Sequence, residues 1–170
     1  AEDVLHALKS LDEFLAGSCD FFCGDSATLF RFLALRVSRR PGSYTLRGTE
    51  ALLARPQDEL ISVLADLGVE GGWRQDERGK KISFFIHSPK GWVLPAEGKI
   101  LEVDVSRSSQ FISAVVLNAW GLPSDLRLRP KKSFASKPYF DLSLHLLRKS
   151  GMRVDEEDSV YRVQARAAPT

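Results

Sequence analysis

The spacing of apolar residues predicts the same succession of elements twice along the chain. In the first half it predicts strands at 19–23, 44–47, 69–74 and 81–87, and helices at 27–37 and 60–67. In the second half it predicts strands at 100–105, 126–129, 153–156 and 160–164, with helices that begin near 108 and before 142. Each half therefore has the order strand, helix, strand, helix, strand, strand, which is an α/β arrangement.

Residues that interrupt helices mark where the predicted helices end. Gly68 and Gly151 each follow the second helix of a half, and Gly121-Leu122-Pro123 follows the helix that begins near 108. In the last helix the apolar positions are Leu142, Leu146 and Leu147, and their spacing predicts the helix.

The two halves align as an internal repeat. An offset of about 82 residues places Ser26 on Ser108 and Pro56 on Pro138. Near the N-terminus, Leu5, Leu8 and Leu11 match the apolar residues of the 60–67 helix at an offset of about 56. We therefore predict one lobe over residues 1–170, with the tail of a first repeat at 1–17, a second repeat at 18–88 and a third at 99–165.

Composition and charge exclude several classes of protein. Hydrophobic residues make up 44% of the 170 residues and charged residues 27%, as in globular proteins. The formal net charge is +2, too small for a dedicated nucleic-acid-binding protein. No apolar run is long enough to span a bilayer, and the N-terminus does not resemble a signal peptide. The first residue is not Met, which favours a chain cut from a longer one.

The two cysteines, Cys19 and Cys23, are too few for a disulfide framework or a zinc site. We expect both to be buried, reduced thiols, which fits a cytoplasmic protein. No catalytic Ser-His-Asp or Cys-His pattern is present, because the three histidines are scattered.

Polar residues gather where predicted strands or loops lead into helices. They are Asp25, Ser26 and Thr28, with Ala27 between them, in one loop, Arg55 in the next, and then Ser108, Ser109, Gln110, Ser136, Lys137 and Tyr139. Helix N-termini offer free N–H groups, and a guanidinium binds carboxylate or phosphate in a forked geometry. The pattern predicts a polar pocket for a small ligand with several negative charges. The residues alone leave an alternative open. In it the serines are helix caps, Arg55 is a surface residue, Lys137 and Tyr139 are structural, and Asp141 is an acid favoured by the helix dipole.

Four of these stretches, in this order, resemble the signatures of the 5-enolpyruvylshikimate-3-phosphate synthase (3-phosphoshikimate 1-carboxyvinyltransferase) family. They are Cys23-Gly24-Asp25-Ser26-Ala27-Thr28-Leu29-Phe30-Arg31, Arg55-Pro56, Ser108-Ser109-Gln110-Phe111-Ile112-Ser113-Ala114 and Ser136-Lys137-Pro138-Tyr139-Phe140-Asp141. The resemblance covers nearly all of the chain. The related UDP-N-acetylglucosamine enolpyruvyl transferases fit the last two stretches poorly.

This resemblance implies a fold and a reaction. The fold is a lobe of three βαβαββ units, here with the first unit truncated, from the inside-out α/β barrel of the enolpyruvyl transferases. The reaction, a step of the shikimate pathway of aromatic amino-acid biosynthesis, moves the carboxyvinyl group of phosphoenolpyruvate to the 5-hydroxyl of shikimate 3-phosphate. The resemblance implies no metal or organic cofactor, no nucleic-acid or membrane partner, and a second lobe of the same enzyme as partner.

The resemblance also implies roles for individual residues. Shikimate 3-phosphate would be held by Ser108, Ser109, Gln110, Ser136 and Tyr139. Phosphoenolpyruvate would lie beside Arg55, Ala27 and Asp25. No catalytic residue is assigned to this chain.

The chain departs from the family pattern at Asp25, where Asn is usual, and at Ala27, where Gly is usual. This chain has no counterpart of the family's Lys-Ser segment and following Arg. It also has no counterpart of the second lobe. We therefore expect the chain alone to be inactive and favour a piece of a full enzyme. The alternative is a divergent, non-catalytic single-lobe homologue that binds a small phosphorylated ligand. A third candidate is a relationship to the RNA-terminal phosphate cyclases, which are distant fold relatives. The net charge of +2 and the absence of a nucleophilic histidine motif argue against it.

Overall fold

The computed structural model describes residues 2–96 and 99–165. Residues 1, 97–98 and 166–170 of the predicted lobe lie outside the described residues. The chain divides into two compact units, Ala1–Val93 and Leu94–Thr170, and each is described by itself.

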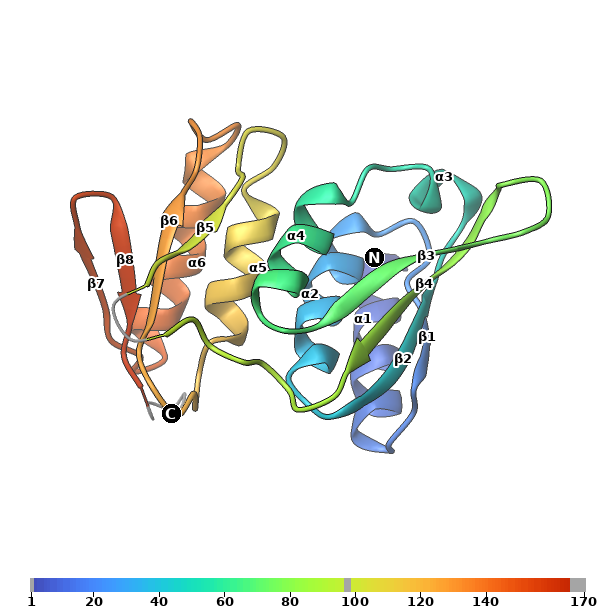
Figure 1. Ribbon diagram of the computed structural model, residues 1–170, viewed down its shortest axis with the longest axis horizontal. Coiled ribbons are helices and arrows are strands. Elements are labelled where there is room, and N and C mark those ends of the chain that lie inside the picture. The colour runs from blue at the N-terminus through green and yellow to red at the C-terminus, as the bar shows by residue number, and fades with distance from the viewer. Residues whose placement is uncertain (1, 97–98, 166–170) are drawn as a thin grey trace. The chain divides into compact units, whose positions relative to one another are not determined.

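The first unit contains one four-stranded sheet with helices packed on it (Figure 1). Its elements are α1 (Glu2–Leu15), β1 (Asp20–Phe22), α2 (Ala27–Ser38), β2 (Gly42–Arg47), α3 (Glu50–Leu53), α4 (Asp58–Asp66), β3 (Glu70–Gln75) and β4 (Lys81–Ser88). The strand order is β1-β2-β4-β3, with β1 and β2 parallel and the other pairs antiparallel. The crossover from β1 to β2 is made by α2.

The second unit repeats this topology. Its elements are β5 (Leu101–Val103), α5 (Gln110–Asn118), β6 (Leu126–Pro130), α6 (Lys137–Lys149), β7 (Val154–Glu157) and β8 (Val160–Val163). The strand order is β5-β6-β8-β7, again with one parallel pair followed by antiparallel pairs. The predicted mixed α/β fold of repeated strand–helix units is confirmed.

Each unit has a core built around aromatic rings. In the first unit Phe84 is fully buried and lies edge-on to Trp73 and Phe30, with ring centroids 5.0 and 5.5 Å away. In the second unit Phe140 lies edge-on to Tyr161 at 4.9 Å, and burial raises the pKa of Tyr161 to about 12. Since burial of large apolar side chains is the main force in folding, these clusters hold each sheet to its helices.

The buried face of α6 is formed mostly by residues other than the leucines that marked the helix in the sequence. Leu142 and Leu146 are about half exposed, whereas Phe140, Leu144 and Leu147 are buried. The helix begins at Lys137, so Phe140, Leu144 and Leu147 follow one helical stripe, spaced by four and three residues. The predicted helix is therefore confirmed, and of the three leucines that marked it only Leu147 is buried.

The match between α1 and the helix at 60–67 does not extend to burial. Leu5, Leu8 and Leu11 are 67%, 55% and 49% exposed, and α1 buries only Ser10 and Phe14. Leu64 and Leu67, with which two of these leucines align, are fully buried. A short helix, α3, was also missed inside an expected loop, where the Thr49 hydroxyl caps it by accepting from the Leu52 N–H at 3.3 Å.

The two cysteines flank β1 and have different environments. Cys23 is fully buried, as predicted, but Cys19 is exposed, so the prediction of two buried thiols is wrong. Burial raises the pKa of Cys23 to about 12. The thiolate is the reactive form, so Cys23 is protected both by exclusion of solvent and by its protonation.

We expect one rapidly reacting thiol in the native protein at pH 8, measured with a chromogenic disulfide reagent. The second thiol should react only after denaturation, because Cys23 must first be exposed. The variant Cys19→Ser should lose the rapid phase. Two rapid thiols in the native protein would contradict the structure.

None of the helices described here is both long and apolar enough to cross a lipid bilayer.

Candidate functional site

In the first unit, two loops meet where the parallel strands β1 and β2 end. The Cys23 N–H donates to the Arg47 carbonyl at 2.8 Å, and the Thr49 N–H donates to the Gly24 carbonyl at 3.0 Å. Because parallel strands end at the same edge of a sheet, the loop that carries Asp25 and the loop that leads toward Arg55 leave the sheet together.

Asp25 is exposed in the first of these loops, and its carboxylate accepts a hydrogen bond from the Thr49 hydroxyl. That bond joins the two loops through their side chains as well as their backbones. Sequence reasoning missed Thr49.

Ala27 is the first residue of α2 and is buried. The preceding Ser26 caps the helix, since its hydroxyl accepts from the Leu29 N–H at 3.3 Å. Ser26 is therefore a helix cap, as the alternative interpretation of the serines expects.

Arg55 is exposed between α3 and α4, and its positive charge acts on Arg31 of α2. Arg31, one turn beyond Ala27 in α2, donates from Nε to Gln57 Oε1 at 3.0 Å. Burial lowers the pKa of Arg31, with Glu59 opposing the shift and Arg55 adding to it. In the sequence Arg31 is marked only as the last residue of a family-like stretch. Gln57 and Glu59 were missed because nothing in their local sequence marks them as partners of α2.

The second unit shows the same arrangement at the ends of β5 and β6. The Lys131 N–H donates to the Val103 carbonyl at 2.9 Å, and the Ala135 N–H donates to the Val105 carbonyl at 3.2 Å. These bonds bring the loop before α6, with Ser136, alongside the loop that leads to Ser108 and α5.

Two serines at these helix starts do not act as caps. Ser109 and Ser136 occupy the N-cap positions of α5 and α6, and neither side chain makes a capping hydrogen bond. The Ser108 hydroxyl, by contrast, accepts from the Gln110 N–H at 3.2 Å. The hydroxyls of Ser109 and Ser136 thus stand at helix N-termini without the local role that such residues usually have.

The remaining predicted residues of this unit are at the surface. Tyr139 is 68% exposed in the first turn of α6. Lys137 pairs with Asp141 at 2.7 Å. Asp141 lies beyond the first turn of α6, which holds no acidic residue, so its interpretation as an acid at the helix start is wrong.

Asp104, which the sequence did not single out, lies in the loop between β5 and Ser108. Its carboxylate pairs with Lys132 at 2.7 Å and accepts from both the hydroxyl and the N–H of Ser106. These partners hold the pKa of Asp104 well below its usual range, so the group is ionised and neutralised by Lys132.

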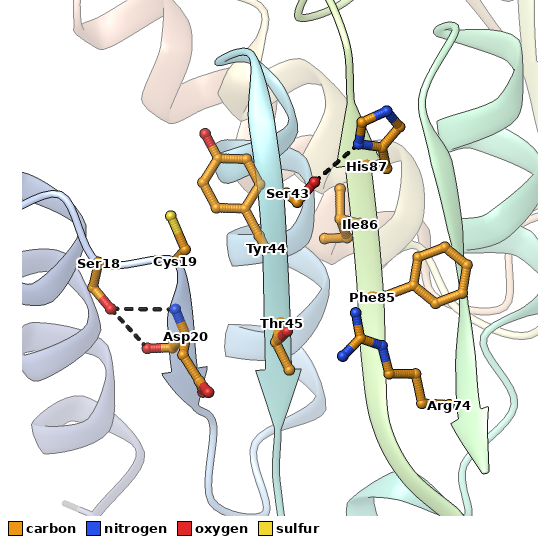
Figure 2. Close-up of a pocket in the computed structure, with 10 residues that line it drawn as sticks. All are labelled: Ser18, Cys19, Asp20, Ser43, Tyr44, Thr45, Arg74, Phe85, Ile86 and His87. Atoms are coloured by element: carbon orange, nitrogen blue, oxygen red, sulfur yellow. Dashed lines mark hydrogen bonds between the residues drawn. The ribbon is translucent and has the colours of Figure 1, made fainter.

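The first unit also has a hollow of about 470 Å³ along β1, β2 and β4, shown in Figure 2. Within it the Ser43 hydroxyl lies 2.9 Å from His87 Nδ1, and the exposed Cys19 is at one side. None of the predicted binding residues lines this hollow. Among the described residues, no three His, Cys, Asp or Glu side chains gather as metal ligands would.

Comparison with known proteins agrees on one family. The family model described as EPSP synthase (3-phosphoshikimate 1-carboxyvinyltransferase) matches residues 2–168. Proteins named 3-phosphoshikimate 1-carboxyvinyltransferase from Tropheryma whipplei and Korarchaeum cryptofilum are 32% and 30% identical, over 83% and 81% of this chain. The chain spans only 30% and 31% of the length of these two curated relatives.

The fold is also similar to that of solved structures. EPSP synthase from Acinetobacter baumannii superimposes with a TM-score of 0.66 at 19% identity, over 90% of this chain and 32% of that one.

Proposed function

Because this chain belongs to the EPSP synthase family, we propose that it is part of an enzyme that transfers the enolpyruvyl group of phosphoenolpyruvate to the 5-hydroxyl of shikimate 3-phosphate. The observation that carries the proposal is the family match over residues 2–168. The chain's coverage of about a third of its relatives supports a partial lobe rather than the whole enzyme. The shikimate pathway and the cytoplasm are the proposed setting, with no nucleic-acid or membrane partner.

The second unit contributes the side that binds shikimate 3-phosphate in this proposal. Ser109 and Ser136 support it, since their hydroxyls stand at helix N-termini and make no capping bond. A phosphate there gains hydroxyl donors together with the partial positive charge of the helix ends. Ser108, Gln110 and Tyr139 complete this half.

The first unit contributes the side that binds phosphoenolpyruvate. Arg55 supplies a charged fork for an anionic group, and the helix start at Ala27 adds backbone N–H groups. Asp25 lies in the same pair of loops, joined to Thr49.

The chemistry explains why such donors are needed. The 5-hydroxyl gives its proton to a base as its oxygen bonds to the central carbon of the enol, and an acid adds a proton to the methylene carbon. Loss of a proton from the new methyl group then expels phosphate and restores the double bond. Two anionic substrates must be held side by side through both steps, and preorganised donors lower that repulsion and the barrier together. A second lobe of the enzyme would supply the acid and base groups.

We expect the isolated 170-residue chain to release no phosphate when both substrates are present. The reason is that it carries only part of the proposed site. The complete enzyme that includes this lobe should release phosphate only with both substrates, in a coupled phosphate assay. Turnover by the isolated chain would overturn the partial-lobe proposal, and a complete enzyme that binds shikimate 3-phosphate without turnover would favour the non-catalytic alternative.

The double change Asp25→Asn with Ala27→Gly in the complete enzyme is expected to lower the KM for phosphoenolpyruvate. The first change removes a carboxylate beside a bound anion, and the second removes a methyl group from a helix start where the ligand approaches the backbone. Steady-state kinetics with phosphoenolpyruvate as the varied substrate measures the effect. An unchanged KM would exclude this account of the two departures.

A further inference from the structure

The hollow of the first unit lies on the face of the sheet that points away from α2. Phe84 and Trp73 pack against each other and toward α2, which marks the opposite face. Because successive side chains of a strand alternate between faces, Phe85 and Arg74 point away from α2. Thr45 is paired with Phe85 in the register of β2 and β4, and all three residues line the hollow (Figure 2).

Arg74 is an exposed arginine without a partner. Its guanidinium makes no hydrogen bond or ion pair with any residue that the structure describes. Asp76, the nearest acid along the chain, instead accepts from the N–H groups of Arg78 and Lys80, each at 2.9 Å, and so closes the hairpin turn. Figure 2 shows the Arg74 side chain crossing β4 toward Thr45. The charge of Arg74 is therefore available to an anion that enters the hollow.

The acids of this face leave that charge uncompensated. Asp20 lines the hollow but is bound by Arg47, whose Nε and terminal nitrogen lie 2.9 and 2.8 Å from one carboxylate oxygen. Glu70 lies opposite His87 in the register of β3 and β4 and does not line the hollow. A guanidinium presents its N–H donors in a forked plane that matches the oxygens of phosphate or carboxylate. The Arg74 end of the hollow therefore suits an anionic group.

Hydroxyl and imidazole groups supply the other polar positions of the hollow. The Thr45 hydroxyl has no hydrogen-bond partner within the described ranges. Ser43 precedes Thr45 by two residues, and its hydroxyl lies 2.9 Å from His87 Nδ1. That contact leaves His87 Nε2 and one lone pair of Ser43 for a second polar group. Ser43 and His87 stand at the end of the hollow opposite Arg74 (Figure 2).

We propose that this hollow binds a small organic anion that carries a hydroxyl group as well as a phosphate or carboxylate. Arg74 and Thr45 hold the anionic group, and Ser43 and His87 hold the hydroxyl group. The volume of about 470 Å³ is typical of a small-molecule site. The site is separate from the residues of the proposed enolpyruvyl transfer, none of which lines it, and it does not depend on that function.

The test follows individual groups by NMR, which distinguishes the hollow from other anion sites of the chain. The 170-residue chain is titrated with glycerol 3-phosphate, glycerate and inorganic phosphate, and with sodium chloride as reference, at constant ionic strength. We expect saturable shifts of the Arg74 Nε–H and the Thr45 backbone N–H with glycerol 3-phosphate or glycerate. The tighter of these two ligands identifies the anionic group as phosphate or carboxylate.

Variants at exposed positions assign the two ends of the hollow. Arg74→Gln should weaken binding of the tighter ligand about tenfold or more. Arg78→Gln removes the same charge from the exposed hairpin turn and should leave binding within twofold of wild type. Ser43→Ala should weaken binding of the hydroxylated ligand about threefold or more and leave inorganic phosphate within twofold. All three side chains are exposed, so the melting temperature should stay at the wild-type value.

The inference is overturned if no anion shifts the Arg74 signal beyond the change seen with sodium chloride, or if Arg74→Gln and Arg78→Gln weaken binding equally. Equal effects of Ser43→Ala on the hydroxylated ligand and on inorganic phosphate would overturn the assignment of the hydroxyl end. Ser136→Ala, on the proposed shikimate 3-phosphate side, should leave the Arg74 response unchanged. Loss of that response would mean that the signals report the other side, and the hollow would not be a site.

Discussion

Replacing Ser109 or Ser136 by alanine in the complete enzyme is expected to weaken the binding of shikimate 3-phosphate by roughly 10–150-fold. Each change removes a hydrogen bond to a charged group, which contributes about 1.5–3 kcal/mol. Neither hydroxyl caps its helix, so the melting temperature should stay at the wild-type value. Calorimetric titration with shikimate 3-phosphate, beside thermal unfolding, measures both quantities.

Ser26→Ala is the matched control, because Ser26 does cap its helix. That variant should lose about 1 kcal/mol of stability and bind shikimate 3-phosphate normally. If Ser109→Ala and Ser136→Ala behave like Ser26→Ala, with lowered melting temperature and wild-type affinity, the two serines are structural and the assignment of the sugar-phosphate side is wrong.

Replacing Phe84 by alanine is expected to lower the free energy of unfolding of the first unit by about 3–5 kcal/mol. Phe84 is fully buried and lies edge-on to both Phe30 and Trp73, so its loss leaves a cavity between α2 and the sheet. The surrounding rings are large and rigid, and they close such a cavity only in part. Urea unfolding followed by circular dichroism measures the change.

The control for this change is Phe22→Ala in β1, where the ring is 47% exposed. It removes the same atoms from a surface position and should reduce stability by about 1 kcal/mol or less. If Phe84→Ala lowers the free energy of unfolding by less than about 1 kcal/mol, the aromatic cluster is not the core of this unit.

The repeated order of strands and helices could be predicted because it depends on local spacing. Apolar residues at helical or alternating intervals, and glycines such as Gly68 with φ +72° at a helix end, act within a few residues of themselves. The positions of Ser109 and Ser136 at helix starts were predictable for the same reason. The motif order along the chain likewise indicated the family before any fold was known.

Burial and long-range partners were decided by the tertiary structure. Which stripe of α6 is buried depended on where the helix begins, and that placed Leu144 inside and Leu142 outside. Whether Cys19 and the leucines of α1 are covered depends on what packs against them, and local spacing does not encode a distant neighbour.

The contacts within the candidate site follow the same division. The sequence by itself determined that Ser26, Ser109 and Ser136 begin helices, but only the fold determined that the first caps its helix and the other two do not. Arg31 and Gln57 are separated by 26 positions and meet because α2 and α4 pack together. A hydrogen bond depends on distances of a few tenths of an ångström, and such distances are determined by the packing of whole elements rather than by the residues next to each partner.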